Sequence, residues 1–199
     1  MAQILGMGFS GGIVKDGLAI ELFDKVSDTA HNLDRMLAKL QAVSQIASTE
    51  LISREISFDM ELDLILGQYR NSIAENQIKV ERQLRVGKTI KTFPSLVRII
   101  IENIIENSIN FASPENPVIN ILIERNENLL TIRVEDNGEG IDKEFHDRLF
   151  EMYFRANERS KGNGLGLYLV KKATEKLNGT VTYAPNLPAG SIFTVNLPI

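Results

Sequence analysis

The sequence predicts an α/β two-layer sandwich, in which a mixed sheet carries helices on one face, preceded by a long amphipathic helix. Apolar residues recur at helical spacing from about Leu18 to Ile46. A second helical pattern, rich in isoleucine, starts at Pro94. Alternating segments at Val118–Glu124 and Leu130–Val134, separated by a polar turn, indicate a hairpin. Helices interleaved with such strands favour one sheet that is covered on one side.

The first helix carries a heptad-like apolar seam that suits a helical hairpin or a dimer. Its members recur at spacings of four or three residues and are Leu22, Val26, Ala30, Leu33, Leu37 and Leu40. The short mixed segment Ala47–Ser53 follows as a plausible linker.

The remaining elements follow from period and punctuation. Strands are expected at Glu55–Phe58, Ile78–Glu81, Thr89–Phe93, Val181–Tyr183 and Ile192–Leu197, and helices at Met60–Ala74, Pro94–Phe111 and Leu165–Leu177. The last of these helices meets Asn178-Gly179, a common stop signal.

Composition excludes several classes of protein. The formal net charge of -4 argues against a nucleic-acid-binding surface. The absence of cysteine excludes disulfides and thiolate zinc sites. No apolar run is long enough to span a bilayer. We therefore expect a cytoplasmic protein or fragment, whose full-length parent could be attached to a membrane.

Three asparagines share a stripe of the helix that starts at Pro94. Asn103, Asn107 and Asn110 are spaced by four and three residues, although Asn is a poor helix former. One interpretation is a solvated face. The other is a row of amide oxygens that could enter the octahedral shell of Mg²⁺ beside phosphate oxygens and waters.

A carboxylate flanked by glycines follows the strand that ends near Glu135. Asp136 could accept a hydrogen bond from the exocyclic amine of adenine, where guanine has a carbonyl instead. Gly138 and Gly140 would let the backbone turn sharply and approach a flat base. The alternative is an ordinary Asp-Asn-Gly turn.

A second glycine segment, Gly162–Gly166, precedes a helix whose N-terminal N–H groups would suit phosphate. The alternative is a loop punctuated by glycine. Between the two glycine segments, Asp142–Lys161 contains aromatic residues together with Arg155, Arg159 and Lys161. These features are typical of a mobile lid over phosphates.

Other signals are weak. Gly6–Gly11 fits G-x-G-x-x-G but lacks the preceding strand of a dinucleotide-binding unit. No P-loop motif occurs. His31 and His146, the only histidines, lie in no cluster of metal-ligand type.

Taken in order, the motifs resemble the catalytic and ATP-binding domain of sensor histidine kinases, the Bergerat-type fold shared with type II topoisomerases and MutL-type mismatch-repair proteins. The matching segments are Asn103–Phe111 (N box), Asp136–Gly140 (first glycine box), Leu149–Arg155 (F box), Gly162–Leu167 (second glycine box) and Gly190–Phe193 (terminal glycine motif).

The resemblance implies ATP and Mg²⁺ as ligands, with Asn107 on the metal and Asp136 on the adenine amine. Phe111 would pack near the base, and Ser191 would support the adenine pocket. Arg155 and the glycines from Gly162 would face the phosphates. The full set of implied nucleotide-binding residues is Asn103, Asn107, Asn110, Phe111, Asp136, Gly138, Gly140, Ile141, Tyr153, Arg155, Gly162, Gly164, Leu165, Gly166, Leu167 and Ser191.

Two positions depart from the patterns of related families. Asn110 stands where histidine kinases often have Lys or Arg. Asn103 stands where the ATP-hydrolysing relatives have a Glu base, which favours a kinase over an ATPase.

The resemblance also implies a domain organisation. Residues 1–47 would be a partial dimerisation and phosphoacceptor hairpin, with Ala2–Gly6 just past the acceptor motif and the acceptor histidine itself absent. Residues 48–199 would be the catalytic domain. His31 lacks acceptor context, so this chain alone is not expected to phosphorylate itself.

The implied function is transfer of the γ-phosphoryl of Mg-ATP to a histidine on a dimerisation helix of the same kinase, for relay to a response regulator receiver domain. The N-terminal helix would form a homodimer. Two alternatives stay open: a non-catalytic nucleotide-binding or dimerisation module, and a Bergerat-type ATPase.

Overall fold

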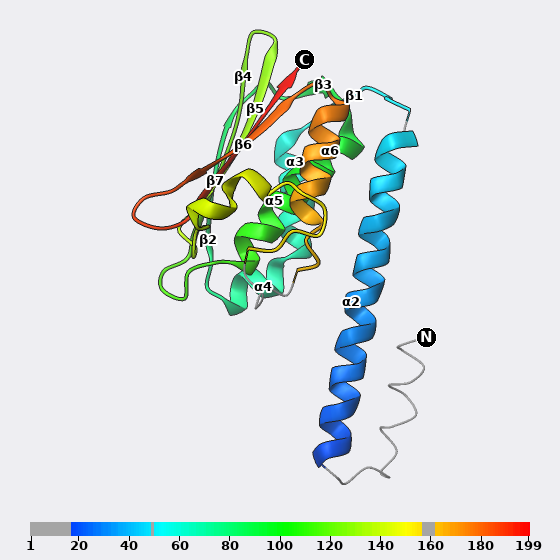
Figure 1. Cartoon of the computed structure of the whole chain (residues 1–199). Coiled ribbons are helices and arrows are strands. Elements are labelled where there is room, and N and C mark those ends of the chain that lie inside the picture. Colours follow the sequence, from blue (N-terminus) through cyan, green and yellow to red (C-terminus); the bar gives the residue numbers. More distant parts are fainter. Residues whose placement is uncertain (1–16, 49, 157–161) are drawn as a thin grey trace. The chain divides into compact units, whose positions relative to one another are not determined.

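The computed structural model describes residues 17–48, 50–156 and 162–199. The chain forms two compact units, Met1–Ala42 and Val43–Ile199. The expected long helix is present as α2 (Gly17–Ser48), shown in Figure 1. Its last turns belong to the larger unit, where Ile46 is buried and the Lys176 ammonium donates to the Ala47 carbonyl at 3.1 Å.

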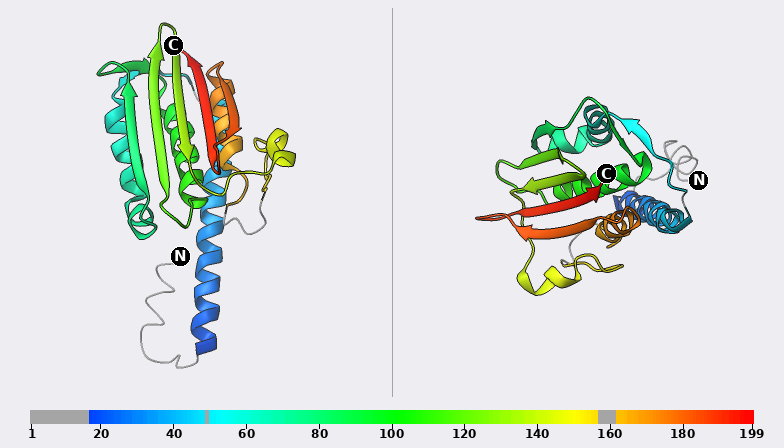
Figure 2. Two further views of the ribbon diagram at one scale, coloured as in Figure 1. Left: turned by 90° about the vertical axis from the view of Figure 1, so that its left-hand side faces the viewer. Right: turned by 90° about the horizontal axis from the view of Figure 1, so that it is seen from above.

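The larger unit is the expected two-layer sandwich. Its sheet has the strand order β2-β4-β5-β7-β6, and only the β2–β4 pairing is parallel. These strands are β2 (Lys79–Arg85), β4 (Val118–Asn126), β5 (Leu129–Asp136), β6 (Thr180–Pro185) and β7 (Ser191–Pro198). Figure 2 shows the helices of this unit on one face of the sheet. They are α3 (Phe58–Gln68), α4 (Arg70–Glu75), α5 (Pro94–Asn110) and α6 (Gly166–Lys176).

The larger unit also contains a two-stranded ribbon and a short 3-10 helix. Strands β1 (Arg54–Ile56) and β3 (Ile90–Thr92) pair with each other as a separate antiparallel ribbon. A 3-10 helix, η1 (Lys143–Arg148), precedes the F box.

Strand alternation builds the core. Ile119, Ile121 and Ile123 of β4 are buried and alternate with half-buried residues, as a sheet packed on one side requires. Helix α5 faces this layer with a run of buried isoleucines, and Pro94 occupies its first turn, where a missing N–H costs nothing. The predicted hairpin, the shared face of its three isoleucines and the start of this helix are therefore confirmed.

The expected single helix over Met60–Ala74 is wrong. It breaks at Tyr69, which ends α3 and precedes α4. Tyr69 is half-buried, and its pKa is raised by burial and by the charges of Glu106 and Glu102 on α5. Gly67 weakens the helix just before the break. Phe58, expected to end a strand, instead begins α3 as a buried residue.

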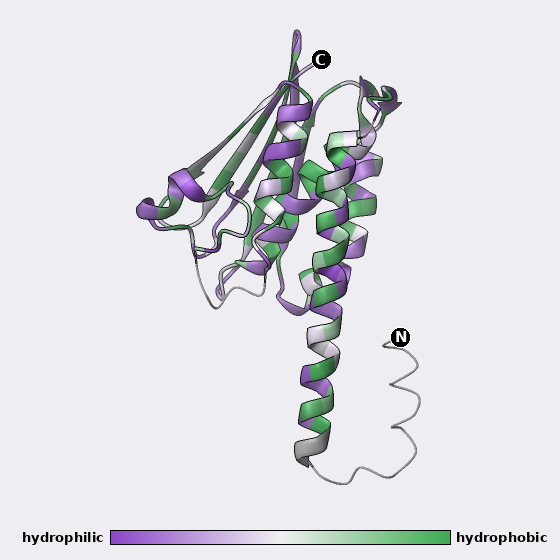
Figure 3. Ribbon diagram, turned by 45° about the vertical axis from the view of Figure 1, so that its right-hand side comes forward, coloured by the Kyte–Doolittle hydropathy of each residue, from purple (hydrophilic) through white to green (hydrophobic). Residues whose placement is uncertain are grey.

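Apolar residues follow the length of α2, as Figure 3 shows. On the part of α2 that belongs to the smaller unit, the exposed apolar residues include Leu22, Val26, Leu33 and Leu37. Among the described residues, no helix has both the length and the apolarity needed to cross a bilayer.

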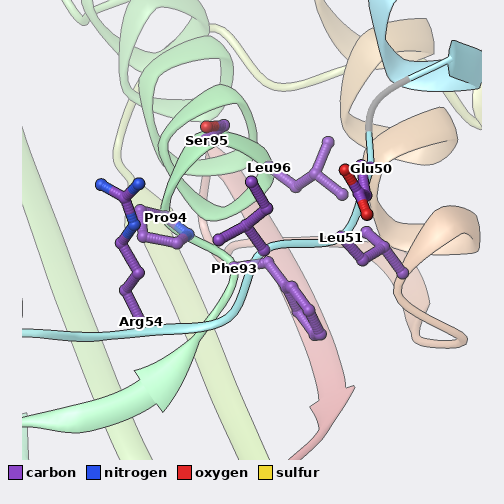
Figure 4. Close-up of a pocket in the computed structure, with 8 residues that line it drawn as sticks. Glu50, Leu51, Arg54, Phe93, Pro94, Ser95 and Leu96 are labelled. Carbon is purple, nitrogen blue, oxygen red and sulfur yellow. The ribbon is translucent and has the colours of Figure 1, made fainter.

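A cavity of about 210 Å³ lies at the N-terminal end of α5, shown in Figure 4. Its lining residues are Glu50, Leu51, Ile52, Arg54, Phe93, Pro94, Ser95 and Leu96. It includes none of the site residues that the sequence predicts, which begin with Asn103 further along the same helix.

Candidate functional site

Asp136 ends β5 with a carboxylate that is almost fully enclosed. Its Oδ1 accepts hydrogen bonds from the backbone N–H groups of Gly138 at 3.0 Å and Ser191 at 3.1 Å. Its Oδ2 accepts from the Ser108 hydroxyl at 2.9 Å. Only 4% of Asp136 is exposed. Burial raises the pKa of Asp136, while these three hydrogen bonds lower it.

Strand pairing explains why Ser191 reaches this carboxylate. Ser191 begins β7 and lies directly opposite Asp136 in the antiparallel register. The family resemblance assigned Ser191 to the adenine pocket, and in the structure its backbone N–H donates a hydrogen bond to Asp136. The two motifs therefore meet, although they are far apart along the chain.

The glycines around Asp136 are required by backbone contacts within the protein. A Cβ on Gly138 would lie 2.1 Å from the Phe111 carbonyl oxygen. A Cβ on Gly190, whose φ is +124°, would lie 2.0 Å from the Asp136 carbonyl oxygen. The sequence attributed Gly138 to the approach of a base, whereas the structure shows that the end of α5 already fills that space.

Asn137 fastens the same turn to the loop after α5. Its Oδ1 accepts from the Val118 N–H at 2.7 Å, and its Nδ2 donates to the Asn116 carbonyl at 2.9 Å. In the same turn, the Glu139 N–H donates to the Phe111 carbonyl at 3.1 Å. Sequence reasoning treated Asn137 as turn punctuation and missed its two contacts, whereas the Glu139 hydrogen bond is what fixes Phe111 relative to this turn.

The three asparagines of α5 differ in their surroundings. Asn103 is buried at 8% exposure, Asn107 is half-buried and Asn110 is exposed. The Asn103 amide donates to the Ile99 carbonyl at 2.8 Å. Its buried Oδ1 finds no hydrogen-bond partner among the described residues. The interpretation as a solvated face is thus wrong for Asn103, because its side chain is buried.

Ser108 was missed from the sequence, although it is completely buried. It continues the buried face of α5 that Ile101 and Ile104 define. A hydroxyl at a core position needs a partner, and this was the available signal. The sequence alone could not show that the partner is Asp136.

The second glycine segment meets the F box through its backbone. The Tyr153 N–H donates to the Gly164 carbonyl at 3.0 Å. A Cβ on Gly164, at φ +69°, would lie 2.5 Å from the Tyr153 carbonyl carbon. Tyr153 itself has φ +64° and is 49% exposed. Such a conformation in an aromatic residue is uncommon and is found mostly at functional sites.

The other residues of the F box and the second glycine box differ in burial. Leu165 is fully buried, and α6 begins at Gly166 with Leu167 half-buried in its first turn. Gly162 and Arg155 are exposed. The predicted lid residues Arg159 and Lys161, like the N-terminal segment Ala2–Gly6, lie outside the described residues.

His146 is held beside the first glycine box. Its Nε2 lies 2.9 Å from the Ile141 carbonyl oxygen, and its ring packs edge-on against Tyr183 at a centroid distance of 4.7 Å. Gly140, at φ +71°, closely approaches the backbone of Gly190. These contacts join η1, β6 and the turn that follows β5.

Residues 93–199 match the family model of histidine kinase-, DNA gyrase B- and HSP90-like ATPases. The chain belongs to this family. The motifs described above, from α5 to the terminal glycine, all fall within the matched residues. The recognition of a sensor histidine kinase domain from the sequence is confirmed.

Named relatives agree with this membership. The chain is 32% identical over 142 residues to phytochrome-like protein Cph1 of Synechocystis sp., covering 69% of this chain and 18% of that protein. It is 33% identical over 135 residues to sensor protein CiaH of Streptococcus pneumoniae, covering 66% of this chain and 30% of CiaH. The chain thus spans less than a third of either relative.

Solved histidine kinases share the fold. Histidine kinase AdeS of Acinetobacter baumannii superposes with a TM-score of 0.75 at 21% identity, covering 98% of this chain and 90% of that one. Full-length ShkA, in complex with AMPPNP, gives 0.76 at 17% identity, covering 94% of this chain and 39% of that one.

Gly138→Ala should destabilise the histidine kinase domain by about 1–3 kcal/mol, because the new Cβ must displace the Phe111 carbonyl. Gly162→Ala is the matched control, since its Cβ meets nothing within 4 Å, and it should change stability by less than about 0.5 kcal/mol. Urea denaturation measures both. Equal stability of the two variants would contradict the close approach at Gly138.

Asp136→Asn should change how the free energy of unfolding depends on pH. Because the folded protein raises the pKa of Asp136, it binds this proton more tightly than the unfolded chain. The contribution of Asp136 to stability therefore falls as pH rises from about 4, the value of an unperturbed Asp, through the raised folded pKa. Asn keeps acceptors for both N–H groups and carries no charge. The free energy of unfolding of the variant should therefore increase relative to that of the wild type over this pH range.

Urea titrations of the nucleotide-free protein from about pH 4 to about pH 8 check this sign. Asp136→Ala serves as the comparison, because it leaves the Ser108 hydroxyl and two N–H groups without their acceptor and should lose stability throughout. If the stability of Asp136→Asn instead falls relative to that of the wild type as pH rises, the raised pKa of Asp136 is refuted.

Proposed function

We propose that the larger unit binds Mg-ATP and transfers its γ-phosphoryl group to a histidine on a dimerisation helix of the same kinase, for relay to a response regulator receiver domain. The observation that carries this proposal is the enclosed Asp136 carboxylate, held by three donors at the end of β5. Family membership supports it, as does the AMPPNP complex of the similar kinase ShkA.

Asp136 would recognise adenine through its exocyclic amine. The carboxylate is oriented before a ligand arrives, because its two oxygens are fixed from α5, from β7 and from its own turn. Such preorganisation lowers the cost of binding. Phe111, tied to the same turn through its carbonyl, would pack near the base.

The residues present fit a Mg²⁺ ion. The buried Asn103 Oδ1 has no partner within residues 17–48, 50–156 and 162–199, and a buried amide oxygen of this kind could accept from a donor or a cation. Asn107 lies one helical turn further on and would be the metal ligand. Among the described residues, no group of three His, Cys, Asp or Glu could hold a metal by itself, so triphosphate oxygens and waters would complete the shell. A bound Mg²⁺ would neutralise phosphate charge.

The reaction needs a histidine nucleophile other than His31 and His146. In the transfer, the bond from the γ-phosphorus to its bridging oxygen breaks, a bond to an imidazole nitrogen forms, and ADP leaves with the electron pair. His146 is packed against Tyr183, and the His31 Nδ1 lies 2.7 Å from the Ser27 carbonyl on α2. The acceptor would therefore come from a separate helix, and the chain alone would not phosphorylate itself.

The competing functions differ at two asparagines. A Bergerat-type ATPase needs a base that accepts a proton from water, and the Asn103 amide cannot do so. A non-catalytic module would be favoured by Asn110, which is exposed and uncharged where the kinases often carry a cation. We place the reaction in the cytoplasm, where ATP is available, and assign dimerisation to the exposed apolar seam of α2.

Calorimetry should show that the wild type binds ATP, and more tightly with Mg²⁺. Asp136→Asn should lower the affinity about tenfold or more, since a hydrogen bond to a charged group contributes roughly 1.5–3 kcal/mol. Asn107→Ala should remove the gain from Mg²⁺ and leave the fold intact. Asn71→Ala, an exposed amide on α4, is the control. Wild-type affinity in Asp136→Asn would sink the assignment of the base contact.

Incubation with γ-labelled ATP tests the transfer. The chain alone should stay unlabelled, and a first-helix fragment that carries the acceptor histidine should gain acid-labile label when it is added. Label on His31 of the chain alone would contradict the proposed domain order. Steady phosphate release without an acceptor would indicate the ATPase, and nucleotide binding without transfer to the fragment would indicate the non-catalytic module.

A further inference from the structure

Ser108 is the side-chain donor to the Asp136 carboxylate among the described residues. It lies within the N box but is not among the nucleotide-binding residues that the sequence predicts. Its hydroxyl is fully buried and lies 2.9 Å from Oδ2, in a contact that joins α5 to the end of β5. The other two donors to Asp136 are backbone N–H groups, which any residue supplies. Ser108 is thus the part of this arrangement that a substitution can remove.

Counting acceptors shows what this hydrogen bond does. An ionised carboxylate offers about four lone-pair positions. The two backbone N–H groups occupy both positions on Oδ1, and the Ser108 hydroxyl occupies one on Oδ2. One acceptor position on Oδ2 is therefore left for a ligand.

The proton of the Ser108 hydroxyl is committed to the carboxylate, which is a stronger acceptor than a neutral carbonyl. The hydroxyl is fully buried and therefore offers no donor to a ligand. The Asp136 carboxylate is the group that would meet the ligand, and it presents only an acceptor.

Resting on the proposed nucleotide site, we propose that Ser108 is a specificity-determining residue that makes the pocket select 6-aminopurines over 6-oxopurines. An amino group at C6 supplies the one N–H that the open position on Oδ2 can accept. A carbonyl at C6 places an acceptor against the carboxylate, which is also an acceptor, and leaving that group unpaired is costly. Without the Ser108 hydroxyl, the carboxylate has a second open position and is no longer fixed in rotation, so it can turn to meet the N1–H of a 6-oxopurine.

The experiment compares ATP with ITP, which differ at C6, by calorimetry in EDTA so that metal ligation does not enter. The wild type should favour ATP by about tenfold or more. Ser108→Ala should reduce this preference several-fold. Ser108→Cys, which keeps nearly the same volume and supplies only a weak donor, should fall with the Ala variant, which separates the hydrogen bond from packing.

Ser95→Ala is the matched control, because Ser95 is an exposed serine in the first turn of the same helix, and its preference should equal that of the wild type. Urea denaturation confirms that each variant is folded. A Ser108→Ala protein whose ATP and ITP affinities fall together, or not at all, keeps the preference unchanged and overturns the inference while the proposed function stands. A wild type that binds neither nucleotide, in EDTA or with added Mg²⁺, overturns both.

Discussion

The enclosed carboxylate of Asp136 is the constraint on which the site depends. An anion removed from water is costly unless its oxygens are satisfied, and here the satisfying groups come from three separate elements. To keep Asp136 buried, the turn after β5, the start of β7 and the last turn of α5 must all remain in place. One side chain thereby links the layer of helices to the sheet at the point where the ligand is proposed to bind.

The surrounding glycines follow from the same constraint. With β5 and β7 paired directly at Asp136 and Ser191, the backbone of Gly190 lies against the Asp136 carbonyl. The Phe111 carbonyl closes on Gly138 from the other side. Side chains at these positions would push the elements apart and open the carboxylate to water. The glycine motifs are thus requirements of packing between elements as much as of ligand approach.

The asparagine helix shows how one sequence pattern can divide into different roles. All three amides follow from one spacing, yet Asn103 is buried, Asn107 is half-buried and Asn110 is exposed. Among the described residues, the Asn103 Oδ1 has no hydrogen-bond partner, and such buried groups call for a specific explanation. This gradient along α5 runs from the packed layer toward its C-terminal end, where Phe111 meets the first glycine box.

The sequence by itself determined the fold class, the long first helix, the hairpin of β4 and β5, and the family, because each depends on periodicity or on motifs read within one element. It also identified Asp136 and Ser191 as residues of one site. Only the tertiary structure decided that Ser108 donates to Asp136, that Asn103 is buried, that Gly138 makes room for a carbonyl, and that the helix before β2 breaks at Tyr69. The physical reason is separation along the chain: the contacts to Asp136 join residues 28 and 55 positions apart, and spacing within a helix or strand fixes a side chain's face but not what that face will meet.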